Sequence, residues 1–117
     1  MTHMIVQVVV GVLAIGGGAT VLVSSLAMLR APDAVSRVNV LSPATGLGMP
    51  CLVLAVWLEW TYENGLDGTV AAKALVAVLA FIVVSSVASN TLGRAALRSG
   101  AALDPRTAPN DLTGNAD

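Results

Sequence analysis

Charged side chains gather in one short stretch of an otherwise apolar sequence. Arg30, Asp33 and Arg37 fall within eight residues, in the segment LRAPDAVSR (29–37). If a helix starts at Asp33, Arg37 lies four residues further on the same face, where a carboxylate and a guanidinium can pair. Arg30 precedes Pro32 at the end of an apolar run, where a cation can interact with the last helix carbonyls or with lipid phosphate. The four residues therefore form a candidate site for setting topology and for contacting a partner.

The sequence has few residues suited to binding a metal, forming a disulfide or binding a phosphate. His3 and Cys51 are the lone histidine and cysteine, so we expect neither a zinc site nor an internal disulfide. The glycines at 16–18 lack the preceding strand and the Lys-Ser/Thr pair of a phosphate-binding loop. A net charge of -1, without a basic block, argues against nucleic acid as a partner. The sequence thus predicts no enzyme, no cofactor and no metal site.

The composition predicts a membrane protein. Of the 117 residues 56% are apolar and 11% are charged, whereas soluble domains are about a quarter charged. The runs 4–29, 41–60 and 69–87 each approach or exceed the roughly 20 helical residues that cross a bilayer. The first run is too long for a signal peptide and has no basic residue before it. We expect an all-α integral membrane protein with three transmembrane helices within residues 1–100, and a disordered tail over 101–117.

Local signals predict where the second and third helices begin. Ser42 followed by Pro43 is typical of an N-cap and a first helical position, and Thr69 is a fair N-cap for the third helix. Pro50 lies inside the second span and cannot donate to the Gly46 carbonyl, so a kink is expected there. The turn-rich sequence 64–68 connects the second and third helices.

The basic residues predict the orientation in the membrane. Those near the first loop and after the third span are Arg30, Arg37, Arg94, Arg98 and Arg106. The second loop has Lys73 alone against three acidic residues. By the positive-inside rule the N-terminus lies outside and the C-terminus is cytoplasmic, with Arg94 and Arg98 as cytoplasmic anchors. Trp57, Trp60 and Tyr62 then lie at the outer interface, where aromatic residues gather.

The spans contain small residues and almost no ionisable ones. Residues 4–29, 38–58 and 74–93 carry no ionisable side chain except Cys51, so proton or ion transport by this chain alone is not expected. The small residues expected to pack helices are Gly16, Thr20, Ser24, Gly46 and Gly48. Pro50 is expected to pack helices as well, or to mark a local hydrated spot. Such faces allow close backbone approach in lipid. They can dock partner helices or pack the chain's own three helices, and both interpretations stay open.

Two segments resemble one known family. The stretch MLRAPDAVSRVNVLSPATGLGMP (28–50) is similar to the signature of the small G subunit of multi-subunit monovalent cation/proton antiporters of the Mrp, Mnh or Pha type. The residues that match are Leu29, Arg30, Pro32, Asp33, Arg37, Leu47 and Gly48. The segment GRAALRSGAAL (93–103) resembles the family's ending after its third helix. The resemblance covers about residues 10–103, but four positions differ from the family pattern, namely Asn39, Pro43, Ser86 and Asn90.

The resemblance implies a function. It suggests an accessory, non-catalytic subunit of a Na+/H+ or other monovalent cation/proton antiporter in the plasma membrane, with the other subunits and membrane lipid as partners. The residues that match are those of the first loop and the C-terminal arginines, which favours a role in assembly. The alternative is a stand-alone small membrane protein that regulates or assembles another membrane complex.

Overall fold

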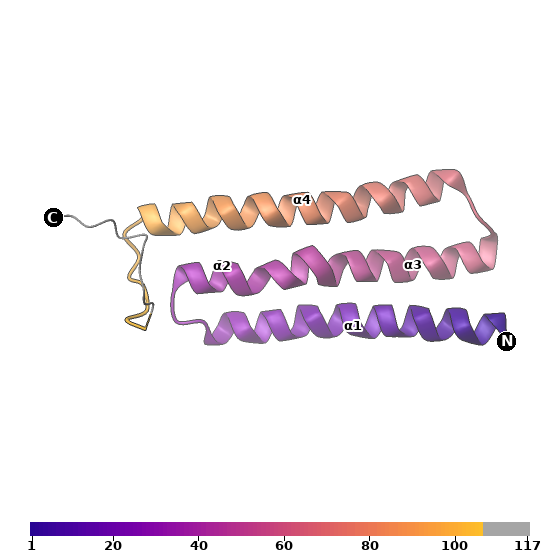
Figure 1. Ribbon diagram of the computed structural model, residues 1–117, viewed down its shortest axis with the longest axis horizontal. Helices are drawn as coiled ribbons and strands as arrows, with labels where there is room; N and C mark the ends of the chain where they lie inside the picture. The colour runs from indigo at the N-terminus through magenta and orange to yellow at the C-terminus, as the bar shows by residue number, and fades with distance from the viewer. Residues whose placement is uncertain (107–117) are drawn as a thin grey trace.

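Three long helical rods lie side by side in the computed structural model, which describes residues 1–106 (Figure 1). In chain order the elements are α1 (Thr2–Arg30), α2 (Ala34–Pro43), the π-helical turn η1 (Ala44–Gly48), α3 (Met49–Asn64) and α4 (Gly68–Arg98). Because α2, η1 and α3 follow one another without a break, they form a single rod over Ala34–Asn64. All three rods are long and apolar enough to cross a membrane, and the described residues contain no strand. The predicted all-α class with three spanning helices is confirmed.

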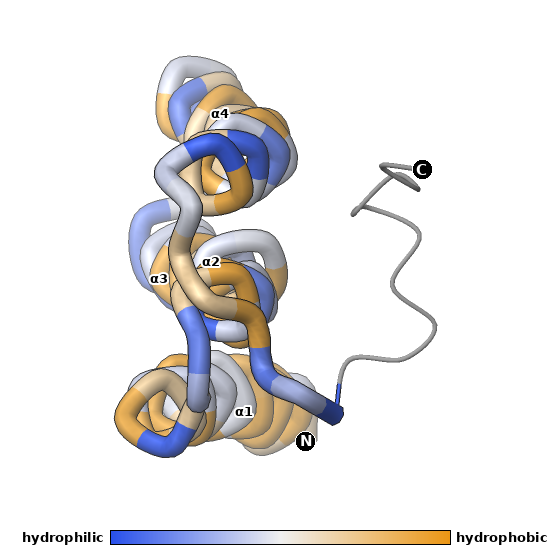
Figure 2. Tube along the Cα trace, turned by 90° about the vertical axis from the view of Figure 1, so that its left-hand side faces the viewer, coloured by the Kyte–Doolittle hydropathy of each residue, from blue (hydrophilic) through white to orange (hydrophobic). Residues whose placement is uncertain are grey.

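The rods form a flat row instead of a closed bundle. The rod made by α2, η1 and α3 lies in the middle, with α1 on one side and α4 on the other, and within the described residues α1 and α4 do not touch. Figure 2 shows the same order from the end, with the middle rod between the two outer ones. The middle rod therefore has two packed sides, and each outer rod has one.

The second helix begins earlier than the sequence predicted. The expected start at Ser42 and Pro43 is wrong, because α2 begins at Ala34 with Asp33 as its N-cap. The Asp33 side chain accepts a hydrogen bond from the Ser36 N–H at 2.7 Å, which is a strong start signal well before the proline. Pro43 removes only one donor from a helix that its neighbours continue.

Both ends of α4, the third rod, also differ from the sequence prediction. Its N-cap is Asp67, and Thr69 supplies the capped N–H, with 2.7 Å between Thr69 N and Asp67 Oδ1. The helix continues past the expected span end near 87 to Arg98, because no proline interrupts residues 88–98. It stops where Gly100 adopts a φ of 72°, a left-handed conformation that glycine takes without steric cost. The apolar run marks the membrane segment, whereas the helix extends into the polar region beyond it.

The rods are longer than the membrane is thick. At about 1.5 Å per residue, rods of 29 to 31 residues measure about 44–47 Å, whereas the hydrocarbon core is about 30 Å thick. If the overhang is shared equally, each rod extends about 7–8 Å beyond the hydrocarbon at either end. The charged residues lie near the rod ends, where headgroups and water are available.

The apolar surface faces outwards. The buried hydrophobic residues are Ala31, Ala44 and Ala55. Many larger apolar side chains are exposed, including Ile15 at 75% and Leu22 at 60%. In lipid such exposure carries no penalty, and the helices are held by close backbone packing. The row thus offers both of its broad faces to lipid or to other proteins.

Candidate functional site

Asp33 holds together the turn between the first two rods and the segment after α4. Its Oδ1 accepts the Ser36 N–H at 2.7 Å, which caps α2, and its Oδ2 accepts the Asp104 N–H at 2.9 Å. The residue is buried, with 7% of its surface exposed. One carboxylate therefore joins two segments that are 71 residues apart in the chain.

The two N–H groups lower the pKa of Asp33. The larger cause is the hydrogen bond from the Asp104 backbone, and the next is that from the Ser36 backbone. Both donors favour the charged form. Because the folded pKa lies below the ordinary value, the stabilisation is present at neutral pH and is lost as the pH falls through the folded pKa.

The expected ion pair between Asp33 and Arg37 is wrong. Arg37 Nε lies 3.3 Å from the Ala31 carbonyl oxygen, to which it donates, and the one ion pair in residues 1–106 joins Arg106 to Asp104 at 2.9 Å. Both Asp33 oxygens already accept backbone N–H groups. Arg37 instead joins the first turn of α2 to the residue that ends α1, so it fixes the tight turn between them. Arg30 is exposed in the last turn of α1, as a lipid-facing anchor would be.

The segment after α4 was not predicted to take part in this site. Residues 101–106 are non-helical and bring Asp104 to Asp33. Asp104 also accepts the Arg106 N–H at 2.8 Å, closing a small turn around Pro105. An Asp-Pro pair is a turn signal in the sequence, but nothing in the sequence pointed to Asp33 as its partner. The remainder of the expected disordered tail, residues 107–117, lies outside the described residues.

Two glycines bring α1 and the middle rod into backbone contact. A Cβ atom on Gly17 would lie 2.8 Å from the Gly48 carbonyl oxygen, and one on Gly48 would lie 3.0 Å from the Gly17 oxygen. The glycine in this contact is Gly17 and not the expected Gly16, which has nothing within 4 Å of such a Cβ. Ser24 is buried in the same helix. Thr20 also faces the contact, because its Cβ would lie 3.5 Å from a Cβ on Gly48, while its hydroxyl donates to the Gly16 carbonyl at 2.8 Å.

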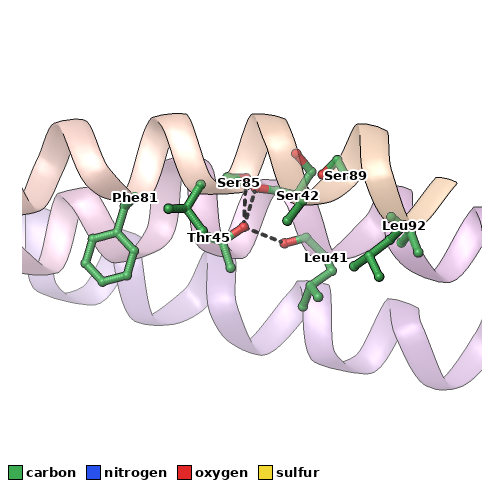
Figure 3. Close-up of a pocket in the computed structure, with 10 residues that line it drawn as sticks. Leu41, Ser42, Thr45, Phe81, Ser85, Ser89 and Leu92 are labelled. Atoms are coloured by element: carbon green, nitrogen blue, oxygen red, sulfur yellow. Dashed lines mark hydrogen bonds between the residues drawn. The ribbon is translucent and has the colours of Figure 1, made fainter. Parts of the chain in front are cut away.

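Gly46, in η1, faces α4 on the other side of the middle rod. A Cβ atom there would lie 3.2 Å from Ser85 Oγ of α4. Around it, Thr45 Oγ1 and Ser85 Oγ are 2.8 Å apart, and Ser85 donates to the Ser42 carbonyl at 3.3 Å. Figure 3 shows these hydroxyl groups converging between the two helices. They border a small cavity of about 170 Å³, which is lined mainly by apolar side chains.

Just before Pro50, where the sequence predicts a kink, the structure has the π-helical turn η1. Within η1 the Met49 N–H bonds to the Ala44 carbonyl, five residues back, and buried Pro50 follows directly. A π-turn redirects helix hydrogen bonds, and here hydroxyl groups supply further donors to nearby carbonyls. The Ser42 carbonyl just before this turn accepts from the Thr45 and Ser85 hydroxyls at 3.3 Å each, and at membrane depth polar backbone atoms need such protein partners.

Aromatic and acidic residues lie at the end of the row that carries the N-terminus and the loop between α3 and α4. The His3 and Tyr62 rings make an edge-to-face contact, with 5.3 Å between centroids. Trp57 Nε1 and Thr61 Oγ1 are buried and have no hydrogen-bond partner among the described residues. The three aromatics predicted at an interface thus lie on the last turns of α3. Arg94 and Arg98 are exposed at the other end of the row, on the last turns of α4.

The charge distribution separates the ends from the middle. Between the two ends the described rods carry no ionisable side chain except the Cys51 thiol. Within residues 1–106 no group of three or more His, Cys, Asp or Glu side chains is placed to hold a metal ion. The arrangement can anchor, orient and pack helices.

Comparison with known proteins identifies the family. The model of a family described as "Na+/H+ antiporter subunit" matches residues 13–97, which include most of α1, the first turn, the whole middle rod and nearly all of α4. The chain belongs to this family. It is also similar to the G subunit of the Na(+)/H(+) antiporter of Alkalihalophilus pseudofirmus, with 26% identity over 107 residues that cover 92% of this chain and 87% of the relative. The stand-alone alternative is not supported, and the resemblance seen in the sequence is confirmed.

The four positions that differ from the family pattern lie on outer surfaces. Asn39 and Pro43 are exposed on α2. Ser86 and Asn90 are exposed on α4, where Asn90 Nδ2 donates to the Ser86 carbonyl at 3.1 Å. The Asn90 side chain thus has a hydrogen-bond partner within its own helix. None of the four residues borders the close contacts of Gly17, Gly46 or Gly48.

Proposed function

We propose that the chain is a structural subunit of a Na+/H+ antiporter complex and does not itself carry sodium ions or protons. It is a multi-pass protein of the plasma membrane, and its partners are the other antiporter subunits. We also propose that the N-terminus lies outside and the C-terminus in the cytoplasm, which the arginine distribution favours.

The observation that carries this proposal is the uncharged middle of all three rods. Transporters keep ionisable residues at membrane depth because binding and release of ions need them, despite their cost. Here such residues lie only near the ends of the rods. The outward-facing apolar side chains and the flat row provide broad surfaces for neighbours.

Flux measurements on the isolated chain and on the assembled complex test the proposal. The full chain is reconstituted in liposomes that contain a pH-sensitive dye and carry an imposed pH gradient. Addition of Na+ is expected to leave the proton leak of these liposomes equal to that of empty ones, whereas the complete complex collapses the gradient. Saturable, Na+-dependent proton movement through the isolated chain would contradict the proposal.

A second measurement separates assembly from transport. A complex produced without this chain should be recovered in lower amount on blue-native gels, with antiport activity reduced in proportion. Full recovery of a complex with no activity would instead show that the chain takes part in the ion pathway.

A further inference from the structure

A surface groove between α3 and α4 lies at the end of the row that carries the second loop. It has a volume of about 450 Å³, and its floor is made by Leu52 and Val53 of α3 with Ala74 and Ala77 of α4. The lining residues of α3 run from 52 to 60, a length of about 12 Å. The groove is open to the surface and apolar at its inner end.

The polar residues of the groove are at its outer end. Trp57, Trp60 and Lys73 line it there, together with the apolar Val56 and Val70. Lys73 is exposed and belongs to no ion pair within the part of the chain that the structure describes. Trp57 Nε1 is buried without an acceptor, which costs free energy. Indole and ammonium groups only donate hydrogen bonds, so the complementary ligand brings acceptor oxygens.

The depth of Lys73 matches that of a lipid phosphate. It lies five residues after the start of α4 at Gly68, which is about 7–8 Å along the helix. This equals the length by which each rod extends beyond the hydrocarbon when the overhang is shared. The ammonium group therefore lies at the boundary between acyl chains and headgroups, beside tryptophans that favour the same depth.

Negative charge lies beyond the cation. Glu63 is exposed on α3, three residues after Trp60 and seven after Val56, so it shares the groove face one turn further out. From the membrane centre outwards, the order is an apolar floor, a cation and a carboxylate. The same order in a ligand is an acyl chain, a phosphate and an ammonium group.

We propose that this groove binds a phospholipid with a phosphate and a primary ammonium headgroup, of the phosphatidylethanolamine type. The acyl chain occupies the apolar floor, the phosphate lies at Lys73, and the ammonium group lies at Glu63. A lipid with net negative charge fits less well, because Glu63 and Asp67 lie at the outer end of the groove.

Tryptophan quenching by brominated lipids tests the proposal on the full chain. The chain has two tryptophans, so the Trp60→Phe variant leaves Trp57 as the single reporter. In phosphatidylcholine vesicles, brominated phosphatidylethanolamine is expected to quench Trp57 with a relative binding constant about three- to ten-fold above that of brominated phosphatidylcholine. Lys73→Gln and Glu63→Gln should each bring this constant to about one, and Arg94→Gln, at the other end of the row, should leave it unchanged.

Two results would overturn the proposal in this assay. One is a constant of about one in the Trp60→Phe variant itself, and the other is tighter binding of brominated phosphatidylglycerol than of brominated phosphatidylethanolamine. Photocrosslinking then tests the groove in the assembled complex. A benzophenone amino acid in place of Val56, which lines the groove and is 71% exposed, should form an adduct with the mass of a phospholipid. A crosslink to another protein of the complex would show that a protein helix fills the groove, and would overturn the lipid assignment.

Discussion

Replacing Gly17 by alanine should loosen the contact between α1 and the middle rod. The added Cβ would lie 2.8 Å from the Gly48 carbonyl oxygen and 3.1 Å from both Cys51 Cβ and Leu52 Cγ. The first atom belongs to a backbone that helix hydrogen bonds hold in place, so the helices must separate. Overpacking of this kind costs about 1–3 kcal/mol. A clash with a backbone atom at 2.8 Å falls in the upper part of that range, at about 2–3 kcal/mol. Alanine regains about 1 kcal/mol through its higher helix propensity, which leaves a net loss of about 1–2 kcal/mol.

Gly16 provides a matched control on the same helix. A Cβ atom there has nothing within 4 Å, so Gly16→Ala adds the same methyl group and the same propensity without a clash. Its effect should be neutral or slightly stabilising. The pair of variants thus separates the close contact from any general effect of losing a glycine.

The Cys51 thiol is a reporter of this contact. It is half-buried beside Gly17, so its alkylation in detergent micelles is faster when α1 separates from α3. When opening is fast compared with alkylation, a loss of about 1–2 kcal/mol raises the open population and the alkylation rate about 5- to 30-fold. The Gly16→Ala rate should equal that of the parent chain or fall below it. Equal rates in both variants, whether raised or unchanged, would refute the reasoning.

Three further predictions concern the turn and the membrane topology. Truncation after residue 100 removes the Asp104 N–H, the largest cause of the lowered pKa, so the Asp33 pKa measured by NMR in micelles should rise towards its ordinary value. As the pH falls through the Asp33 pKa of the intact chain, protonation should shift the Asp104 amide resonance, and an unperturbed amide would contradict the hydrogen bond. In a background without Cys51, a cysteine replacing Gly65 should react with an impermeant maleimide from outside, and one replacing Val35 only after permeabilisation; the reverse pattern would invert the topology.

The helices were predictable because membrane spans follow from composition and length. Apolar runs of about 20 residues have few alternatives in lipid, and the short loops at 31–33 and 65–67 follow from Pro32 and Gly65. Helix ends were harder to predict. Ser42 and Pro43 form a genuine start signal, but Asp33 supplies an earlier one, and sequence alone does not rank the two. The span end near 87 described the apolar run and missed the polar turns of α4.

The side-chain contacts of the candidate site were only partly predictable. The sequence placed Asp33 and Arg37 at a spacing suitable for an ion pair, yet the carboxylate makes its bonds to backbone N–H groups, one from a segment distant in sequence. Likewise, small residues every four positions did not reveal whether Gly16 or Gly17 faces the middle rod. That choice depends on the rotation of α1 about its axis, which the neighbouring helix determines.

The flat row has a mechanical consequence for any assembly that contains it. Because α1 and α4 do not touch within the described chain, the layer of rods is one helix thick, or about 10 Å. Two neighbours on its opposite faces would thus be separated by a single layer of side chains and backbone. Small movements of one neighbour would be transmitted to the other through that layer, with no deep core to absorb them. The subunit would then transmit movement between its two neighbours as well as hold them apart.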